Sequence, residues 1–229
     1  MALLTPMTLA EAQMALAAYD LDIAAVQALA AGSVNSNFMV RTQSGERYFV
    51  RLYEEQGAAG AAAELAVIRE LAASGVPTPA PRARRDGGYV GEHRGRPLGV
   101  QPWVDGEILC FGRLTPETNR SVGRALGRVH RCSPLLSHIP TGRFGIDGLR
   151  ERLDRVDRTD ASYAADTRRI RERIDYHVAR SPSSLPSGLI HGDLFRDNVL
   201  WRARPSAQAG AELELCALLD FESASAGVF

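Results

Sequence analysis

The chain has 229 residues, of which 45% are hydrophobic, and its 27 arginines balance its 27 acidic residues; it contains no lysine. Balanced charge argues against general binding of nucleic acid, and no apolar run is long enough to span a bilayer. The opening residues MALLTPMTLAEAQ lack the basic start of a secretory signal. We therefore expect a globular cytoplasmic protein with neither a membrane nor a nucleic-acid partner.

The first half of the chain predicts an antiparallel sheet with helices packed on it. A capping box from Thr8 to Glu11 predicts a short helix, with Leu9, Leu16 and Tyr19 as its apolar residues. Alternating apolar residues on either side of the turn QSGE, and again in GGYVGE and RPLGVQPWV, predict strands. The Ala-rich stretch between them predicts a helix ended by Gly75. We place a first lobe at residues 1–104.

The second half predicts mainly helix, which we assign to a second lobe at residues 105–229. Thr115 can cap a helix whose first residue is Pro116, and helical spacing recurs over residues 149–156 and 163–178. The runs NVLW and LELCALLDF then predict a β-hairpin.

The stretch LIHGDLFRDNVLW, residues 189–201, sets polar side chains between two apolar runs. If the hairpin strands pair, Asp193, Asn198 and Asp220 lie close together. Two carboxylates and an amide suit Mg²⁺ and a phosphate rather than zinc. Phosphoryl transfer requires such oxygen ligands and a carboxylate beside the acceptor hydroxyl. The alternative is that these residues only form turns at strand ends.

The motifs HGDLFRDN and LLDFE resemble those of the aminoglycoside phosphotransferase and choline kinase superfamily. The resemblance covers nearly the whole chain, including GSVNSNF, YFVRLYE, AAELAVIREL and QPWVDGE, and SVNSNFMV with HGDLFRDNVL is most similar to type II homoserine kinases. It implies an α+β, protein-kinase-like two-lobe fold: a small antiparallel-sheet N-lobe with one helix, and a mainly helical C-lobe that is incomplete here.

The resemblance also implies an activity, ATP-dependent phosphorylation of a small-molecule hydroxyl, and a role for each matching residue. Asp193 would be the catalytic base, Asn198 and Asp220 would hold Mg²⁺, and His191 would brace the loop between them. The residues implied in binding ATP are Ser33, Asn35, Ser36, Arg51, Glu64, Gln101 and Trp103. Homoserine is the first candidate acceptor, followed by an aminoglycoside or another amino alcohol, and a nucleotide-binding module without catalysis is the alternative from another class.

Simpler interpretations stand beside several of these roles. Glu64 can be a solvated helix residue, Trp103 a core aromatic, and the loop from Gly32 to Asn37 an ordinary turn. Arg51 replaces the lysine usual in the family; its strand alternates so that Tyr48, Val50 and Leu52 face the other way, and an exposed sheet face is its simpler interpretation.

The chain stops at Phe229, soon after Asp220, where the relatives continue through further helices. We therefore expect the C-terminal part to be missing and apolar side chains after Ile174 to be exposed.

Overall fold

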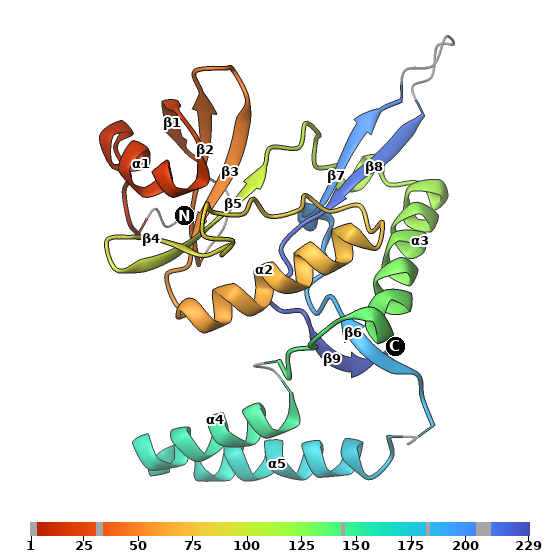
Figure 1. The fold of residues 1–229 in the computed structure, drawn as a ribbon. Helices are drawn as coiled ribbons and strands as arrows, with labels where there is room; N and C mark the ends of the chain where they lie inside the picture. The colour runs from red at the N-terminus through yellow and green to blue at the C-terminus, as the bar shows by residue number, and fades with distance from the viewer. Residues whose placement is uncertain (1–3, 31–33, 143–144, 182–183, 205–211) are drawn as a thin grey trace.

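A five-stranded antiparallel sheet forms the N-terminal part of the computed structural model, which describes residues 4–30, 34–142, 145–181, 184–204 and 212–229 (Figure 1). The strands are β1 Ile23–Ala28, β2 Ser36–Thr42, β3 Arg47–Leu52, β4 Gly91–His93 and β5 Arg96–Pro102. Their order in the sheet is β1-β2-β3-β5-β4. The strands predicted around the QSGE turn and in RPLGVQPWV are confirmed.

One face of this sheet packs beneath helix α1, Leu9–Leu16. The predicted capping box is present, because the Thr8 N–H donates to Glu11 Oε2 at 2.8 Å and Thr8 Oγ1 accepts from the Glu11 N–H at 3.3 Å. Leu16 and Tyr19 are buried as expected, whereas Leu9 is 40% exposed because the first turn of the helix points its side chain outward.

The stretch GGYVGE is mostly irregular, which corrects the strand predicted there. Only Gly91 and Glu92 of this stretch are in a strand, because Arg85 and Asp86 form a turn before it and Arg94 and Gly95 then fold the chain straight back. Arg94 and Gly95 both have positive φ, 50° and 74°, which is the geometry of a tight two-residue hairpin turn. The strand β4 is therefore only three residues long.

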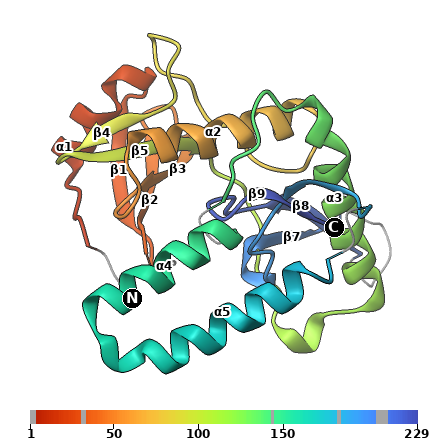
Figure 2. The ribbon, with the colours of Figure 1, turned by 90° about the horizontal axis from the view of Figure 1, so that it is seen from below.

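Helix α2, Ala58–Ala73, lies between the sheet and the C-terminal part of the chain (Figures 1 and 2). Leu65 faces Gly99 of the sheet, where an added Cβ would lie 3.1 Å from it. Val67, Ile68 and Leu71 instead join a second apolar core with side chains from beyond residue 105. The helix is therefore shared by the two halves of the molecule.

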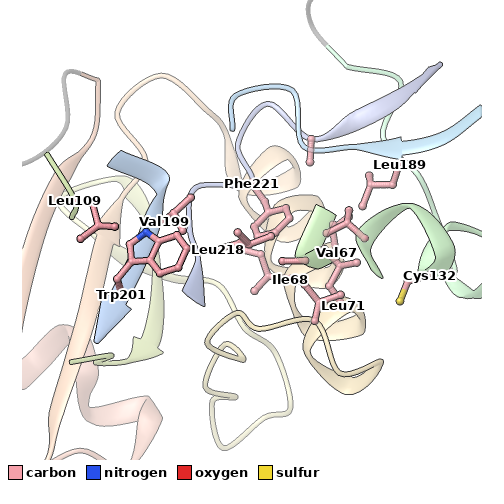
Figure 3. Close-up of a cluster of buried hydrophobic side chains, with 14 residues drawn as sticks. Val67, Ile68, Leu71, Leu109, Cys132, Leu189, Val199, Trp201, Leu218 and Phe221 are labelled. Atoms are coloured by element: carbon pink, nitrogen blue, oxygen red, sulfur yellow. The ribbon is translucent and has the colours of Figure 1, made fainter. Parts of the chain in front are cut away.

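The second core centres on a β-hairpin made of β7 Val199–Ala203 and β8 Leu213–Leu218. Figure 3 shows Val199, Trp201, Leu218 and Phe221 from this region packed toward the α2 side chains. Each fully buried side chain of this size contributes about 1.5–3 kcal/mol to stability. The hairpin predicted from NVLW and LELCALLDF is confirmed, and this core fixes its position against α2.

The remaining helices are α3 Pro116–Cys132, α4 Ile146–Thr159 and α5 Ala164–Val178. Thr115 caps α3 and Pro116 is its first residue, as predicted. Helices α4 and α5 run side by side, away from the sheet (Figures 1 and 2). Short 3-10 segments occupy Ala17–Tyr19, Phe111–Arg113, Ser133–Leu135, Ala161–Tyr163 and Arg196–Asn198.

The strands β6 Ser187–Ile190 and β9 Ser225–Val228 pair antiparallel next to α3. The sequence did not predict this pair, because both strands are four residues long and rich in serine, glycine and alanine. In the part of the chain that follows Ile174, apolar side chains are exposed, as expected. These are Tyr176 at 47%, Val178 at 44% and Phe229 at 40%. Among the described residues, no helix is long and apolar enough to cross a membrane.

Candidate active site

A cavity of about 1030 Å³ lies between the sheet, α2 and the loops of the C-terminal half. Most of the residues predicted for the site line it, although they come from places up to 185 positions apart in the sequence. These residues are Asn35, Arg51, Glu64, Gln101, Trp103, Asp193, Asn198 and Asp220. The structure therefore brings the predicted nucleotide-binding and metal-binding groups to one cavity.

One of the described residues predicted to bind nucleotide, Ser36, is not among the cavity lining. Ser36, the first residue of β2, is fully buried and its hydroxyl donates to Glu54 Oε1 at 2.6 Å. Its place in the strand turns it toward the N-terminal segment rather than the cavity, which corrects the predicted direct contact with nucleotide. Ser33 lies outside the described residues.

The loop that carries Asp193 is fixed by its own backbone. Gly192 has a φ of 78°, and a Cβ at this position would collide with the carbonyl oxygen of Ser223, so only glycine fits. The Asp193 carbonyl accepts hydrogen bonds from Asn198 Nδ2 at 2.7 Å and from the Phe195 N–H at 2.9 Å. These contacts hold Asp193 and Asn198 together at the cavity.

His191 is buried beneath this loop. Its Nε2 donates to the Leu219 carbonyl at 2.9 Å, and its Nδ1 accepts from the Asp193 N–H at 3.4 Å. Burial lowers its pKa, which favours the neutral ring that these two bonds require. The ring therefore ties the Asp193 loop to the residue before Asp220, as a brace would.

Arg51 projects from β3 into the cavity and contacts two carboxylates. Its Nη1 lies 2.9 Å from Asp220 Oδ1 and 3.2 Å from Glu64 Oε1, and the side chain is only 12% exposed. Burial works to lower its pKa, but Glu64 and Asp220 outweigh that effect and raise it. The predicted pairing of Arg51 with Glu64 is present, and its interpretation as an exposed arginine is wrong.

Glu64 lies near two other carboxylates, those of Asp220 and Glu222. Burial, opposed by Arg51 and reinforced by Asp220 and Glu222, raises the pKa of its carboxyl from 4.5 to about 7. Arg51 contacts two of these carboxylates, Glu64 and Asp220, and Glu222 also lines the cavity. An arrangement of this kind is suited to a further cation.

Two buried polar atoms at this position also lack a hydrogen-bond partner among the described residues. They are Arg51 Nε, which is a donor, and Glu64 Oε2, which is an acceptor. Buried polar groups are normally paired, and leaving one unpaired costs about 1–3 kcal/mol. A ligand with both anionic oxygens and a cation fits these two atoms.

Asp220 follows β8 in a left-handed conformation, with a φ of 60°. Aspartate tolerates this region better than most residues, but the conformation still has a cost and such residues concentrate at functional sites. The N–H of the preceding Leu219 donates to the Asn198 carbonyl at 2.9 Å, which joins the segments that carry Asn198 and Asp220.

The described residues contain no group of three or more His, Cys, Asp or Glu side chains placed to hold a metal ion. Mg²⁺ does not need such a group, since it takes one or two carboxylates and completes its shell with water and phosphate oxygens. Asn198 and Asp220 can supply protein oxygens for such an ion, so the residues present fit it.

Sequence reasoning missed two acidic residues next to the site, Glu54 and Glu222. Asn35 Nδ2 donates to Glu222 Oε2 at 2.7 Å, and the Glu54 N–H donates to Asn35 Oδ1 at 3.2 Å. Glu222 stands two positions after Asp220, within the motif LLDFE that carries the predicted metal ligand. That motif could have indicated Glu222, whereas nothing local indicates Glu54.

Comparison with curated proteins finds homoserine kinases. The chain is 32% identical to that of Agrobacterium fabrum over 226 residues, which are 96% of this chain and 66% of the relative. It is 31% identical to that of Burkholderia cenocepacia over 213 residues, 89% of this chain and 61% of the relative. The chain thus spans slightly less than two thirds of the length of these relatives.

Solved structures of similar fold include two kinases in complex with nucleotides. Spectinomycin phosphotransferase in complex with ADP and spectinomycin has a TM-score of 0.65 at 16% identity, covering 97% of this chain and 71% of that one. Amicoumacin kinase in complex with AMP-PNP and Ca²⁺ has a TM-score of 0.69 at 18% identity, covering 94% and 65%. At these identities the similarity shows the kinase-like fold alone.

The sequence profile of the phosphotransferase enzyme family matches residues 25–229. This range contains every residue that lines the cavity, from Leu29 to Ser223. The chain belongs to the phosphotransferase enzyme family.

Proposed function

We propose that this chain is the nucleotide-binding and catalytic part of a kinase that transfers a phosphoryl group from ATP to a hydroxyl of a small molecule. The observation that supports this best is that one cavity is lined both by Asp193 and Asn198 and by the ion pairs of Arg51. Those ion pairs join Arg51 to Glu64 and to Asp220. Phosphoryl transfer depends chiefly on positioning and charge stabilisation, and these groups supply both.

Asp193 is proposed to accept the proton of the attacking hydroxyl. Its carboxylate belongs to the cavity lining, and its backbone is held from two sides by Asn198 and Phe195. A fixed loop matters because a general base must lie within hydrogen-bond distance of the proton that it removes. His191 remains neutral beneath the loop and takes no proton from the acceptor in this proposal.

Arg51 is proposed to bind phosphate oxygens of ATP while Glu64 holds it in place. A guanidinium offers a planar fork of donors that can serve a phosphate and a carboxylate together, so it can replace the usual lysine with altered geometry. Asn198 and Asp220 are proposed to hold Mg²⁺, which when bound would neutralise charge on the phosphate oxygens. Gln101 and Trp103 are proposed to line the nucleoside side of the cavity.

Homoserine is the acceptor that the comparisons favour. The relatives that are 30% to 34% identical to this chain are named homoserine kinase, whereas the structural neighbours named for antibiotics are 16% to 20% identical. Aminoglycosides and other amino alcohols come next, because they also present a hydroxyl beside an amine. In each case the transferred group and the base are the same.

The proposal is tested by incubating the protein with ATP, Mg²⁺ and one acceptor at a time. We expect acceptor-dependent release of ADP with homoserine, and a phosphorylated product of matching mass. Phosphorylation of an aminoglycoside alone would correct the acceptor. Tight binding of ATP by calorimetry with no product from any acceptor would replace the kinase by a nucleotide-binding module.

A further inference from the structure

The residues that precede α1 are tied to the first residue of β2. The N–H groups of Leu4 and Thr5 donate to Ser36 Oγ at 3.1 Å and 3.0 Å, although they lie more than thirty positions away in the sequence. Ser36 Oγ in turn donates to Glu54 Oε1 at 2.6 Å, and Thr5 Oγ1 donates to Glu54 Oε2 at 3.0 Å. Both carboxylate oxygens of Glu54 are therefore bound from this side.

Glu54 is an unusual carboxylate because its side chain is only 4% exposed. Carboxylates are rarely buried unless they are paired and hydrogen-bonded. Arg96 contributes to both needs, because its Nε lies 3.6 Å from Glu54 Oε2 and its Nη1 donates to the Glu54 carbonyl at 2.6 Å. With so many partners, Glu54 has one defined position, and so does the backbone that carries it.

Asn35 connects the backbone of Glu54 to the cavity through hydrogen bonds. The Glu54 N–H donates to Asn35 Oδ1 at 3.2 Å, and Asn35 Nδ2 donates to Glu222 Oε2 at 2.7 Å. Asn35 is only 6% exposed and belongs to the cavity lining. A continuous chain of hydrogen bonds thus runs from the N-terminal segment, across the sheet end, to the residue two positions after Asp220.

We propose that Thr5, Ser36 and Glu54 are positioning residues for the nucleotide side of the cleft. They hold the Asn35 amide against Glu222 and so set the distance between the start of β2 and the segment that follows Asp220. None of the three contacts the ligand in this scheme. The inference rests on the proposed function for the identity of the ligand, a nucleoside triphosphate, but the positioning itself can be measured without any ligand.

Thr5→Val tests the inference, because it removes the hydroxyl that binds Glu54 while keeping the shape of the side chain. Amide hydrogen exchange of the unliganded protein should become faster by roughly threefold or more in peptides covering residues 34–37 and also in peptides covering 219–223. Exchange in α3 should stay the same. Faster exchange confined to residues 4–8 would overturn the inference, since the segment would then stabilise only itself.

Calorimetric binding of ATP provides the second measurement. Thr5→Val should bind ATP roughly three- to tenfold more weakly, which corresponds to the net contribution of about one ordinary hydrogen bond, and Thr5→Ser should recover most of the affinity. Ser36→Ala should reproduce the loss. Equal affinities in all four proteins would overturn the inference, whereas a wild-type protein that binds no ATP would contradict the proposed function and leave the exchange measurement to decide the positioning role.

Discussion

Arg51 in the cleft and Arg171 on the α4–α5 hairpin each contact two carboxylates at similar distances. Arg51 lies 2.9 Å from Asp220 and 3.2 Å from Glu64, and Arg171 lies 2.7 Å from Asp154 and 2.8 Å from Asp157. Their surroundings differ: Arg51 and Glu64 are 12% and 5% exposed, whereas Arg171 and Asp154 are 31% and 56% exposed.

Burial decides what each group contributes. The two charges of an exposed ion pair are well hydrated when apart, so the pair contributes only about 0–1 kcal/mol to the free energy of unfolding. A buried pair has already lost its hydration, so removing one partner leaves an uncompensated charge and costs about 3–5 kcal/mol. The number of ion pairs therefore says little about stability in this arginine-rich chain, and the difference between the two regions can be measured.

The largest effect is expected for Arg51→Ala. The substitution leaves Glu64 buried beside Asp220 without its guanidinium, so the free energy of unfolding should fall by about 3–5 kcal/mol. Urea denaturation measures it. Arg51→Lys keeps a positive charge and should lose less, because a point charge replaces only part of the fork. A loss of stability below about 1 kcal/mol for Arg51→Ala would show that the Arg51 ion pairs contribute no more than the exposed ion pairs of the hairpin.

The second prediction concerns pH. Burial raises the pKa of Glu64 from 4.5 to about 7, so the folded protein holds this proton more tightly than the unfolded chain does. The stability contributed by the proton is complete below pH 4.5 and is lost as pH rises through about 7. The free energy of unfolding of the wild type should therefore fall by up to roughly 3 kcal/mol, relative to that of Glu64→Gln, between pH 4.5 and pH 8.

Glu151→Gln on α4 is the matched control, because it changes an exposed glutamate in the same way. Its stability relative to the wild type should not vary across this pH range. If the Glu64→Gln difference were equally flat, the carboxyl would titrate normally in spite of its burial.

The third prediction compares two aspartates. Asp193→Asn keeps the shape of the proposed base but removes its charge, so kcat should fall by roughly 100-fold or more with little change in nucleotide affinity. Asp175→Asn, which removes an exposed partner of Arg150 on the hairpin, should leave kcat unchanged. Steady-state release of ADP measures both variants. Near-normal turnover by Asp193→Asn would remove this residue from the chemistry.

Local patterns predicted most of the elements but not their pairing over long distances. The capping residues Thr8 and Thr115 and the alternation in β3 are visible in a few neighbouring residues, and all three predictions are confirmed. The pairing of β6 with β9 is not visible, because its short Ser- and Gly-containing strands carry no alternation. The position of α2, with Leu65 against the sheet and Val67 and Ile68 in the second core, depends on what each of its sides meets, which no local pattern contains.

The same distinction applies to the site. The hairpin spacing predicted that Asp193, Asn198 and Asp220 would lie close together, because strand pairing brings distant residues near one another, and all three line the same cavity. The sequence placed Ser36 wrongly, since the direction of a side chain at the first residue of a strand depends on the segment that covers it. Here that segment is residues 4–5, and Glu54 was missed for the same reason.

The fourth prediction concerns the metal. Asparagine tolerates the φ of 60° found at Asp220 as well as aspartate does. Asp220→Asn therefore removes the charge without straining the backbone and isolates the electrostatic contribution. Mg²⁺ should increase the affinity of the wild type for ATP, and the increase should be roughly tenfold smaller in the variant. Calorimetry with and without Mg²⁺ measures it, and Asp154→Asn on the hairpin is the control. An unchanged metal dependence would remove Asp220 from the metal site.

The smallest effect is expected for Arg171→Ala. Both of its carboxylate partners retain access to water, so each is rehydrated when the guanidinium is lost, and the free energy of unfolding should fall by less than about 1 kcal/mol. What remains is a screened attraction, which should shrink further between about 0.05 M and about 1 M salt as the screening length drops to a few ångströms. Urea denaturation of the wild type and the variant at both salt concentrations measures the difference. The loss from Arg51→Ala should be nearly independent of salt, because ions do not enter the buried pair. An Arg171 loss of several kcal/mol, or one that persists at high salt, would show that the hairpin is held by its charges as firmly as the cleft is.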